Sequence, residues 1–238
     1  MKKMIFLFAS IFFALPSIGQ EPGSVSSSKI DLNVDVVSRY VWRGLLYNAS
    51  PNIQPTLSYT KSGFSIGSWG SYGLSSQYAE VDFFASYSTG PLTFLVYDYF
   101  NEDEGDLQAN DFFNYKEKIT AHAVEGSIFY TGGDGFPIKL TAAMFVYGND
   151  RNPDNGDQYY STYFELGYPL NVADHPLDIF IGGTPQKGLY HSDAGIVNIG
   201  LSTTKELEIS DRFKLPIKAT LSVNPSADNV FLVIGMTF

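Results

Sequence analysis

The chain has 238 residues, a formal net charge of −10 and no cysteine, so it can form no disulfide. The acidic balance excludes the basic surface by which proteins bind nucleic acid. Charged residues make up 17 % of the sequence and aromatic residues 16 %, whereas soluble domains carry about 25 % charged residues. This composition is typical of a protein that shows an aromatic, apolar face to something other than water.

The amino-terminal segment has the pattern of a secretory signal peptide. Two lysines precede an almost wholly apolar run, Met4–Leu15, and small residues follow it at Pro16–Gly19. The run is shorter than the about 20 residues that a membrane-spanning helix needs. We therefore predict a signal peptide over 1–19, a short leader over 20–28 and one exported β-barrel over 29–238.

The rest of the chain alternates apolar and polar residues in segments of about ten residues, which is the pattern of transmembrane strands. From Ile30 to Trp42, apolar and aromatic side chains occupy one face of the expected strand, and most charged ones occupy the other. Twelve strands are predicted in chain order: Ile30–Trp42, Asn52–Thr60, Phe64–Ser71, Tyr78–Ser88, Leu92–Phe100, Ile119–Tyr130, Ile138–Tyr147, Tyr159–Tyr168, Leu177–Thr184, Ile196–Thr203, Leu215–Asn224 and Asn229–Phe238.

The lengths of the connections support the same architecture. Long connections such as 101–111 and 148–158 alternate with short ones such as 61–63 and 89–91, as long outer loops alternate with short periplasmic turns in membrane barrels. A longer turn expected around Lys205–Phe213 fits this rule less well. Because an open sheet edge cannot persist in lipid, the first strand must pair with the last. The predicted fold is an all-β, transmembrane, antiparallel up-and-down β-barrel of about twelve strands.

Aromatic residues fall near the predicted strand ends, where membrane barrels carry two aromatic girdles. The periplasmic girdle would contain Tyr59, Phe64, Tyr87, Tyr168 and Phe238, and the outer girdle Tyr40, Trp42 and Tyr160.

Charged side chains on the polar faces of the strands are the candidate functional residues. By parity they point into the barrel, where charges can set the ion selectivity of a channel. The predicted lumen-lining residues are Asp31, Asp35, Arg39, Arg43, Glu80, Asp82, Lys139, Glu165 and Lys218. The same charges could instead pair across a plugged interior, and the sequence leaves pore and plug both open.

No motif in the sequence carries a convincing catalytic or metal site. Gly63–Gly67 matches the G-x-S-x-G pattern, but Ser65 lies within an alternating strand rather than at a strand-to-helix elbow. The acidic loop 150–157 has oxygen donors at alternate positions, as a calcium-binding loop does. Such a loop has glycine at its sixth position and glutamate at its twelfth, whereas here Gly156 is the seventh residue and Ser161 the twelfth. We predict no catalytic residue, no cofactor and no bound metal.

The segment Ser38–Gly44, SRYVWRG, resembles the S-x-Y-V-F/W-R-G signature near the mature start of TorF-type porins. The order of the segments that follow, as far as Tyr99, is also similar to that family, and the likeness is looser beyond it. The resemblance implies a small outer-membrane barrel with the role of a porin. It carries over no catalytic residue and no known solute.

The predicted function is therefore passive diffusion of small solutes or ions across the bacterial outer membrane. The expected partners are outer-membrane lipid, the solutes, and the barrel-assembly machinery, which would recognise the C-terminal Phe238. Two alternatives stay open: a barrel enzyme of the lipase or protease type, and a non-conducting structural or adhesion barrel.

Overall fold

The computed structural model describes residues 28–133, 135–173, 175–211 and 213–238. The predicted signal peptide, 1–19, and residues 20–27 of the predicted leader lie outside the described residues. Within the described ranges, no helix is long and apolar enough to cross a membrane.

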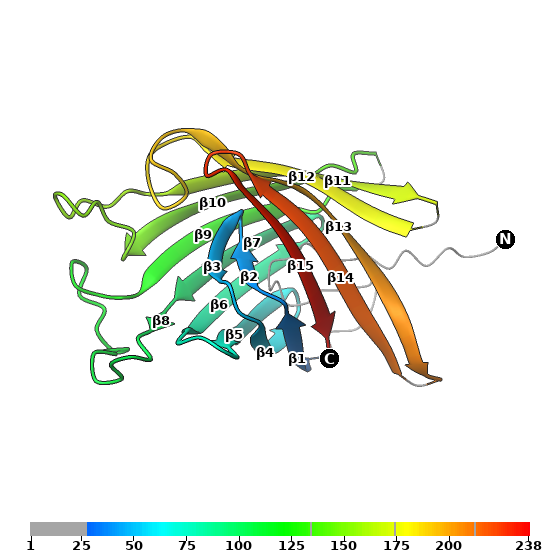
Figure 1. The fold of residues 1–238 in the computed structure, drawn as a ribbon, viewed down its shortest axis with the longest axis horizontal. Coiled ribbons are helices and arrows are strands. Elements are labelled where there is room, and N and C mark those ends of the chain that lie inside the picture. Colours follow the sequence, from blue (N-terminus) through cyan, green and yellow to red (C-terminus); the bar gives the residue numbers. More distant parts are fainter. Residues whose placement is uncertain (1–27, 134, 174, 212) are drawn as a thin grey trace.

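All regular elements of the described residues are β-strands (Figure 1). Their bounds are β1 (Lys29–Val37), β2 (Tyr40–Trp42), β3 (Leu45–Asn48), β4 (Asn52–Lys61), β5 (Phe64–Gly73), β6 (Ala79–Thr89), β7 (Leu92–Tyr99), β8 (Asn101–Glu102), β9 (Ala123–Tyr130), β10 (Lys139–Gly148), β11 (Thr162–Val172), β12 (His175–Thr184), β13 (Gly195–Ser210), β14 (Phe213–Asn224) and β15 (Asn229–Thr237).

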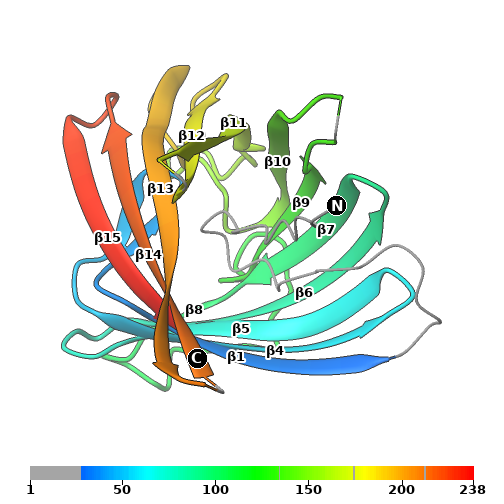
Figure 2. The same cartoon turned by 90° about the vertical axis from the view of Figure 1, so that its right-hand side faces the viewer.

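Twelve of these strands form one closed antiparallel barrel. They follow one another around the ring in chain order, and β15 pairs with β1 to close it (Figure 2). The two-residue strand β8 adds to the sheet beside β6, and β2 and β3 form a separate hairpin. The predicted fold of an all-β, up-and-down, twelve-stranded barrel is confirmed.

The polarity of the barrel is the reverse of that of a soluble protein. In β4 the buried residues are polar and the most exposed ones apolar: Asn52, Gln54, Thr56 and Ser58 against Ile53, Leu57 and Tyr59. The same inversion recurs in β14, where Thr220, Ser222 and Asn224 are buried and Leu221 is exposed. Since successive strand residues point to opposite faces, these strands turn hydrogen-bonding groups inward and apolar ones outward. Buried aromatic and aliphatic clusters share the interior with the polar groups, one of them formed by Trp69, Phe84, Leu95, Tyr97 and Phe129.

Connections at the two ends of the barrel differ in length. One end, here called the short-turn end, contains the connections 62–63 and 90–91. The opposite long-loop end contains 103–122, 149–161 and 185–194. The turn expected around Lys205–Phe213 is wrong, because β13 and β14 remain paired as far as Ser210 and Phe213. The two strands extend the wall at the short-turn end instead.

The first predicted strand is also wrong in its length. The strand β1 ends at Val37, and a bend at Ser38 and Arg39 turns the chain away from the wall. Residues Tyr40–Asn48, here called the lumen hairpin, then fold inward as β2 and β3. Arg43 and Gly44 form its turn with φ values of 49° and 78°, the left-handed geometry of tight hairpin turns.

The seam that closes the barrel is short. Strands β1 and β15 share three register pairs, from Asp35–Thr237 to Val37–Gly235. Backbone hydrogen bonds between Val34 and Phe238 extend the seam at one end, and a bond from the Ser38 N–H to the Ile234 carbonyl extends it at the other. Every other pair of neighbours in the ring shares at least six register pairs.

Candidate functional site

The lumen hairpin crosses the interior near the long-loop end and packs against opposite walls. Trp42 is 7 % exposed. Its ring lies 5.7 Å from that of Tyr99 on β7, 6.4 Å from that of Phe145 on β10, and 5.7 Å from that of Tyr190 in the loop 185–194. The expectation that Tyr40 and Trp42 belong to an outer girdle is therefore wrong. Inside the barrel their rings gain aromatic contacts that an extended first strand would not give them.

The tip of the hairpin fits closely against the opposite wall. Asn224 Nδ2 on β14 donates a hydrogen bond to the Gly44 carbonyl at 3.1 Å. A Cβ at Gly44 would come within 1.8 Å of the Val197 carbonyl oxygen on β13. Only glycine meets both the close approach and the positive φ without strain. The hairpin thus reaches across from β7 and β10 to β13 and β14.

Arg43 anchors this tip through a buried ion pair. Its guanidinium donates two hydrogen bonds to Glu125 on β9, one of them 2.9 Å long, and the side chains of both residues are 1 % exposed. The guanidinium carbon also lies 4.3 Å from the ring centre of Trp42 and 4.8 Å from that of Tyr163. Two buried charges are tolerated here because the pairing is bidentate and further groups enclose it.

Tyr190 completes the anchor from the loop 185–194. Its hydroxyl oxygen accepts a hydrogen bond from Arg43 Nη1 and lies 3.4 Å from Glu125 Oε2, to which it donates. Burial raises the pKa of the Tyr190 hydroxyl well above its ordinary value, so the phenol stays neutral and can serve both partners. The loop is thereby tied to the hairpin and to the wall at one point.

Two carboxylates lie together on the wall beneath the other side of the hairpin. Glu80 and Asp82 on β6 are 2 % and 0 % exposed. Tyr78 donates its hydroxyl to Glu80 at 2.5 Å, and the Phe100 N–H donates to Asp82 Oδ1 at 3.1 Å. Tyr40 of the hairpin packs edge-on to Tyr78, with ring centres 5.9 Å apart. Both carboxyl groups are thus enclosed in this region of the lumen.

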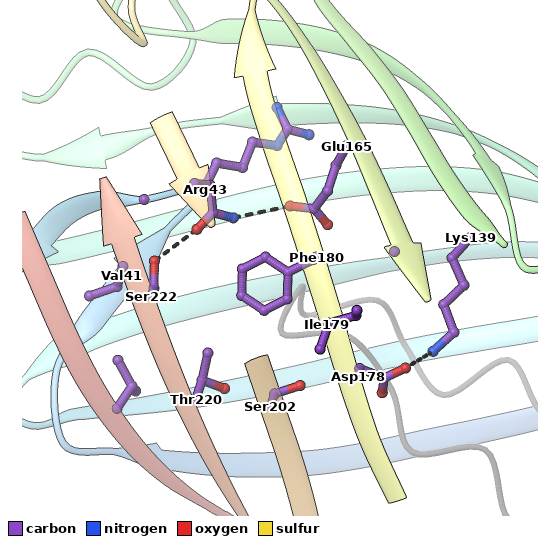
Figure 3. Close-up of a pocket in the computed structure, with 14 residues that line it drawn as sticks. Val41, Arg43, Lys139, Glu165, Asp178, Ile179, Phe180, Ser202, Thr220 and Ser222 are labelled. Carbon is purple, nitrogen blue, oxygen red and sulfur yellow. Dashed lines mark hydrogen bonds and ion pairs between the residues drawn. The ribbon is translucent and has the colours of Figure 1, made fainter. Parts of the chain in front are cut away.

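A cavity lies on the short-turn side of the hairpin (Figure 3). Its empty volume is about 660 Å³, including the open mouth. Lys139 Nζ on β10 and Asp178 Oδ1 on β12 are 2.6 Å apart on one wall. On another wall Asn198 Nδ2 donates to Glu165 Oε2 at 3.0 Å, and Ser222 donates to Asn198 Oδ1 at 2.8 Å. Residues Val41, Arg43 and Gly44 of the lumen hairpin also line it.

The predicted lumen residues fall into three groups. Arg43, Lys139 and Glu165 line the cavity, and Lys218 interacts electrostatically with its charged residues. Glu80 and Asp82 lie together under the hairpin. Asp31, Asp35 and Arg39 are partly buried; Asp31 pairs with Lys29 at 2.5 Å, Asp35 accepts from Thr237 at 2.5 Å, and Arg39 lies in the bend after β1. That all nine line a conducting lumen stays a prediction.

Sequence reasoning missed three residues that build this site: Glu125, Asp178 and Tyr190. Alternation could have found two of them. Glu125 shares the inward face of β9 with Ser127, and Asp178 lies between the apolar Leu177 and Ile179 on β12. Tyr190 lies in a loop without periodicity, so no sequence pattern indicates its inward position.

Ser65 of the G-x-S-x-G pattern and the buried His122 have separate partners. Ser65 is buried on β5, and its hydroxyl bonds to that of Thr60 at 2.9 Å. His122 lies in a separate cluster, where Nδ1 is 2.9 Å from Asp98 Oδ1 and its ring stacks on Tyr115 at 4.0 Å. Among the described residues, no group of three His, Cys, Asp or Glu side chains could hold a metal ion.

A family model described as "Bacterial protein of unknown function (Gcw_chp)" matches residues 21–183, a range that takes in the barrel from β1 through nearly all of β12. No curated protein and no solved structure gives a significant match. The resemblance to TorF-type porins stays a prediction.

Proposed function

We propose, for a chain that belongs to the Gcw_chp family of bacterial proteins of unknown function, the role of a porin-like outer-membrane channel. It passes small solutes or ions by diffusion, and the lumen hairpin forms its constriction. The observation that carries this proposal is the reversed polarity of wall strands such as β4 and β14, which bury polar side chains and expose apolar ones to the outside.

The dimensions of the wall support insertion in a bilayer. A transmembrane strand needs about 9–11 residues, and β4, β5 and β10 have 10 residues each. A closed barrel pairs its backbone groups between strands, which lipid requires because it offers no hydrogen bonds. The proposed orientation places the long-loop end outside the cell and the short-turn end in the periplasm. Phe238, which is 55 % exposed at the short-turn end, remains the proposed contact for barrel assembly.

The interior supports passage of polar rather than apolar solutes. Charged groups of both signs line the cavity, and the acidic pair Glu80 and Asp82 lies near the long-loop mouth. Rings of charge and narrow constrictions are the means by which channels select ions. No constellation in the described interior resembles a catalytic one, so we propose no enzymatic role.

One observation favours a second candidate, a non-conducting structural barrel. The lumen hairpin is held at both faces, by Arg43 with Glu125 and by the close fit of Gly44 against β13. If these contacts never open, the hairpin is a permanent plug rather than a constriction. Conductance distinguishes the two functions directly.

The test is single-channel recording of the mature protein in a planar bilayer, beside a Gly44→Ala variant. The wild type is expected to give small discrete steps. Gly44→Ala is expected to give larger ones, because the added Cβ cannot coexist with the Val197 carbonyl and displaces the hairpin tip. Gly126→Ala is the matched control, since no atom lies within 4 Å of the Cβ that it adds.

The outcomes separate the two candidates. Steps from the variant alone would identify a channel that is closed at rest. Silence from both proteins, shown by protease protection to be folded and inserted, would contradict the channel and leave the structural barrel.

A further inference from the structure

We propose that the cavity beneath the lumen hairpin is a binding site for small zwitterionic solutes with an apolar side chain, such as a free amino acid. This inference names the solute class of the proposed channel and rests on that function for the route by which the solute arrives. Three features of the cavity support it: its charged groups of both signs, the unpartnered hydroxyl of Thr220 and its apolar surface.

Charged groups of both signs lie at the cavity. Lys139 and Asp178 pair at 2.6 Å, and Glu165 lines the same space. Lys218 lies beside them, and its charge interacts with those of Asp178, Lys139 and Glu165. Arg43 also lines the cavity but is already paired with Glu125, so the cavity presents charged groups of both signs. A solute with a single charge would be attracted only by the side chains of opposite charge and would add a net charge to the cavity. A zwitterion can pair with side chains of both signs and adds no net charge.

Hydrogen-bonding groups are available for both ends of such a solute. Thr220 is 8 % exposed, lines the cavity, and its hydroxyl has no hydrogen-bond partner among the described residues. Ser202 presents a second hydroxyl on the neighbouring strand, directly opposite Thr220 in the register of β13 and β14. A buried polar group without a partner costs free energy, which a bound solute carboxylate would remove. Asp178 and Glu165 would receive the ammonium.

The remaining surface suits an apolar side chain. Val41 of the hairpin, Phe180 on β12 and Val233 on β15 line the same cavity (Figure 3). An inorganic ion would leave most of this surface unused, and a neutral sugar would leave both charge types without a complement.

The experiment measures binding to the folded, mature barrel in detergent by calorimetry and by the fluorescence of Trp42 and Trp69. Leucine is the zwitterionic probe. 4-Methylpentanoate lacks its ammonium, isopentylamine lacks its carboxylate, and glucose lacks both charges. We expect saturable binding of leucine, with both singly charged analogues at least 10-fold weaker and glucose without effect.

Two variants test the residues. Asp178→Asn is expected to weaken leucine binding at least 10-fold. Thr220→Val keeps the shape of the side chain but removes the hydroxyl, and should weaken binding about 5-fold while the barrel still folds. Asp154→Asn, an exposed carboxylate in the loop 149–161, is the matched control and should bind as the wild type does.

Equal binding of leucine and its two analogues, a preference for glucose, or no binding by a folded barrel would overturn the inference. Failure of the proposed channel function would give a different combination of results. Leucine binding by a protein that never conducts would keep the site and reject the porin function, and conduction without leucine binding would do the reverse.

Discussion

Arg43 combines an unusual backbone conformation with a buried ion pair. It occupies a left-handed conformation with a φ of 49°, which costs a non-glycine residue about 1 kcal/mol or more. The turn places its guanidinium between Trp42 and Tyr163 and against Glu125. The strained position is therefore retained because the surrounding contacts stabilise it by more than it costs.

Removal of Glu125's charge should release the lumen hairpin. Glu125→Gln keeps the shape of the side chain but takes away the carboxylate that faces a buried guanidinium, and breaking a buried pair in this way costs about 3–5 kcal/mol. We expect a loss of at least about 3 kcal/mol in the free energy of unfolding, measured by denaturant titration in lipid vesicles.

The matched control is Glu117→Gln. Glu117 also pairs with an arginine, Arg151, but its side chain is 63 % exposed, so its removal should change stability by less than about 1 kcal/mol. Equal effects of the two substitutions would show that the Arg43–Glu125 pair does not hold the hairpin.

At the scale of the elements, the alternation of apolar and polar residues predicted the strands of the barrel wall but did not predict the lumen hairpin. The wall strands need an apolar outer face and a more polar inner one. Apolar and polar residues therefore alternate along the sequence of each strand with a period of two. The run from Ile30 to Trp42 continues the same alternation through the bend at Ser38 and Arg39. Arg43-Gly44 also lacks the Asn-Gly or Asp-Gly signature of tight hairpin turns. The fold of the hairpin depends on contacts with distant strands that local pattern does not encode.

The connections between elements can be tested for sidedness because the chain has no cysteine. We expect Asp154→Cys, in a long loop, to react with a membrane-impermeant maleimide on intact cells. Lys61→Cys, beside the short turn after β4, should react only after the cells are opened. Both residues are exposed, so a difference in labelling reports their side of the membrane. The opposite pattern would reverse the proposed orientation.

At the scale of the whole molecule, the reversed polarity makes a prediction about single substitutions. Leu57, at the middle of β4, is 51 % exposed on the apolar wall. Leu57→Arg should cost about 2–4 kcal/mol of stability in lipid vesicles, as a charge at the bilayer midplane does.

The control for this substitution is Leu74→Arg. Leu74 is 59 % exposed but follows β5 at the long-loop end, where the cost should be about 0–1 kcal/mol. Both substitutions expose an arginine on the outside of the barrel. If they proved equally mild, the wall would not face lipid.

The candidate site could be predicted only in part. Parity along the strands indicated Glu80, Asp82, Lys139 and Glu165 as inward, because a barrel wall has two faces. Arg43 also lies inside, but because the lumen hairpin folds inward rather than because of its parity on an extended strand. Parity could not show that Arg43 meets Glu125, 82 residues further along the chain, or that the loop 185–194 brings Tyr190 into the interior. Such pairings depend on which loops fold inward, and loops carry no periodic signal.

The short seam has a consequence for the lifetime of the folded barrel. Rupture of a closed ring must begin between two neighbouring strands, and it begins most readily where the fewest hydrogen bonds are broken. That place is the joint between β1 and β15, which holds three register pairs and lies between the two strands that are furthest apart in the chain. We expect resistance to slow, irreversible inactivation to depend on this joint more than on the rest of the wall. Each added pair along it would lengthen the survival of the barrel even where its equilibrium stability changed little.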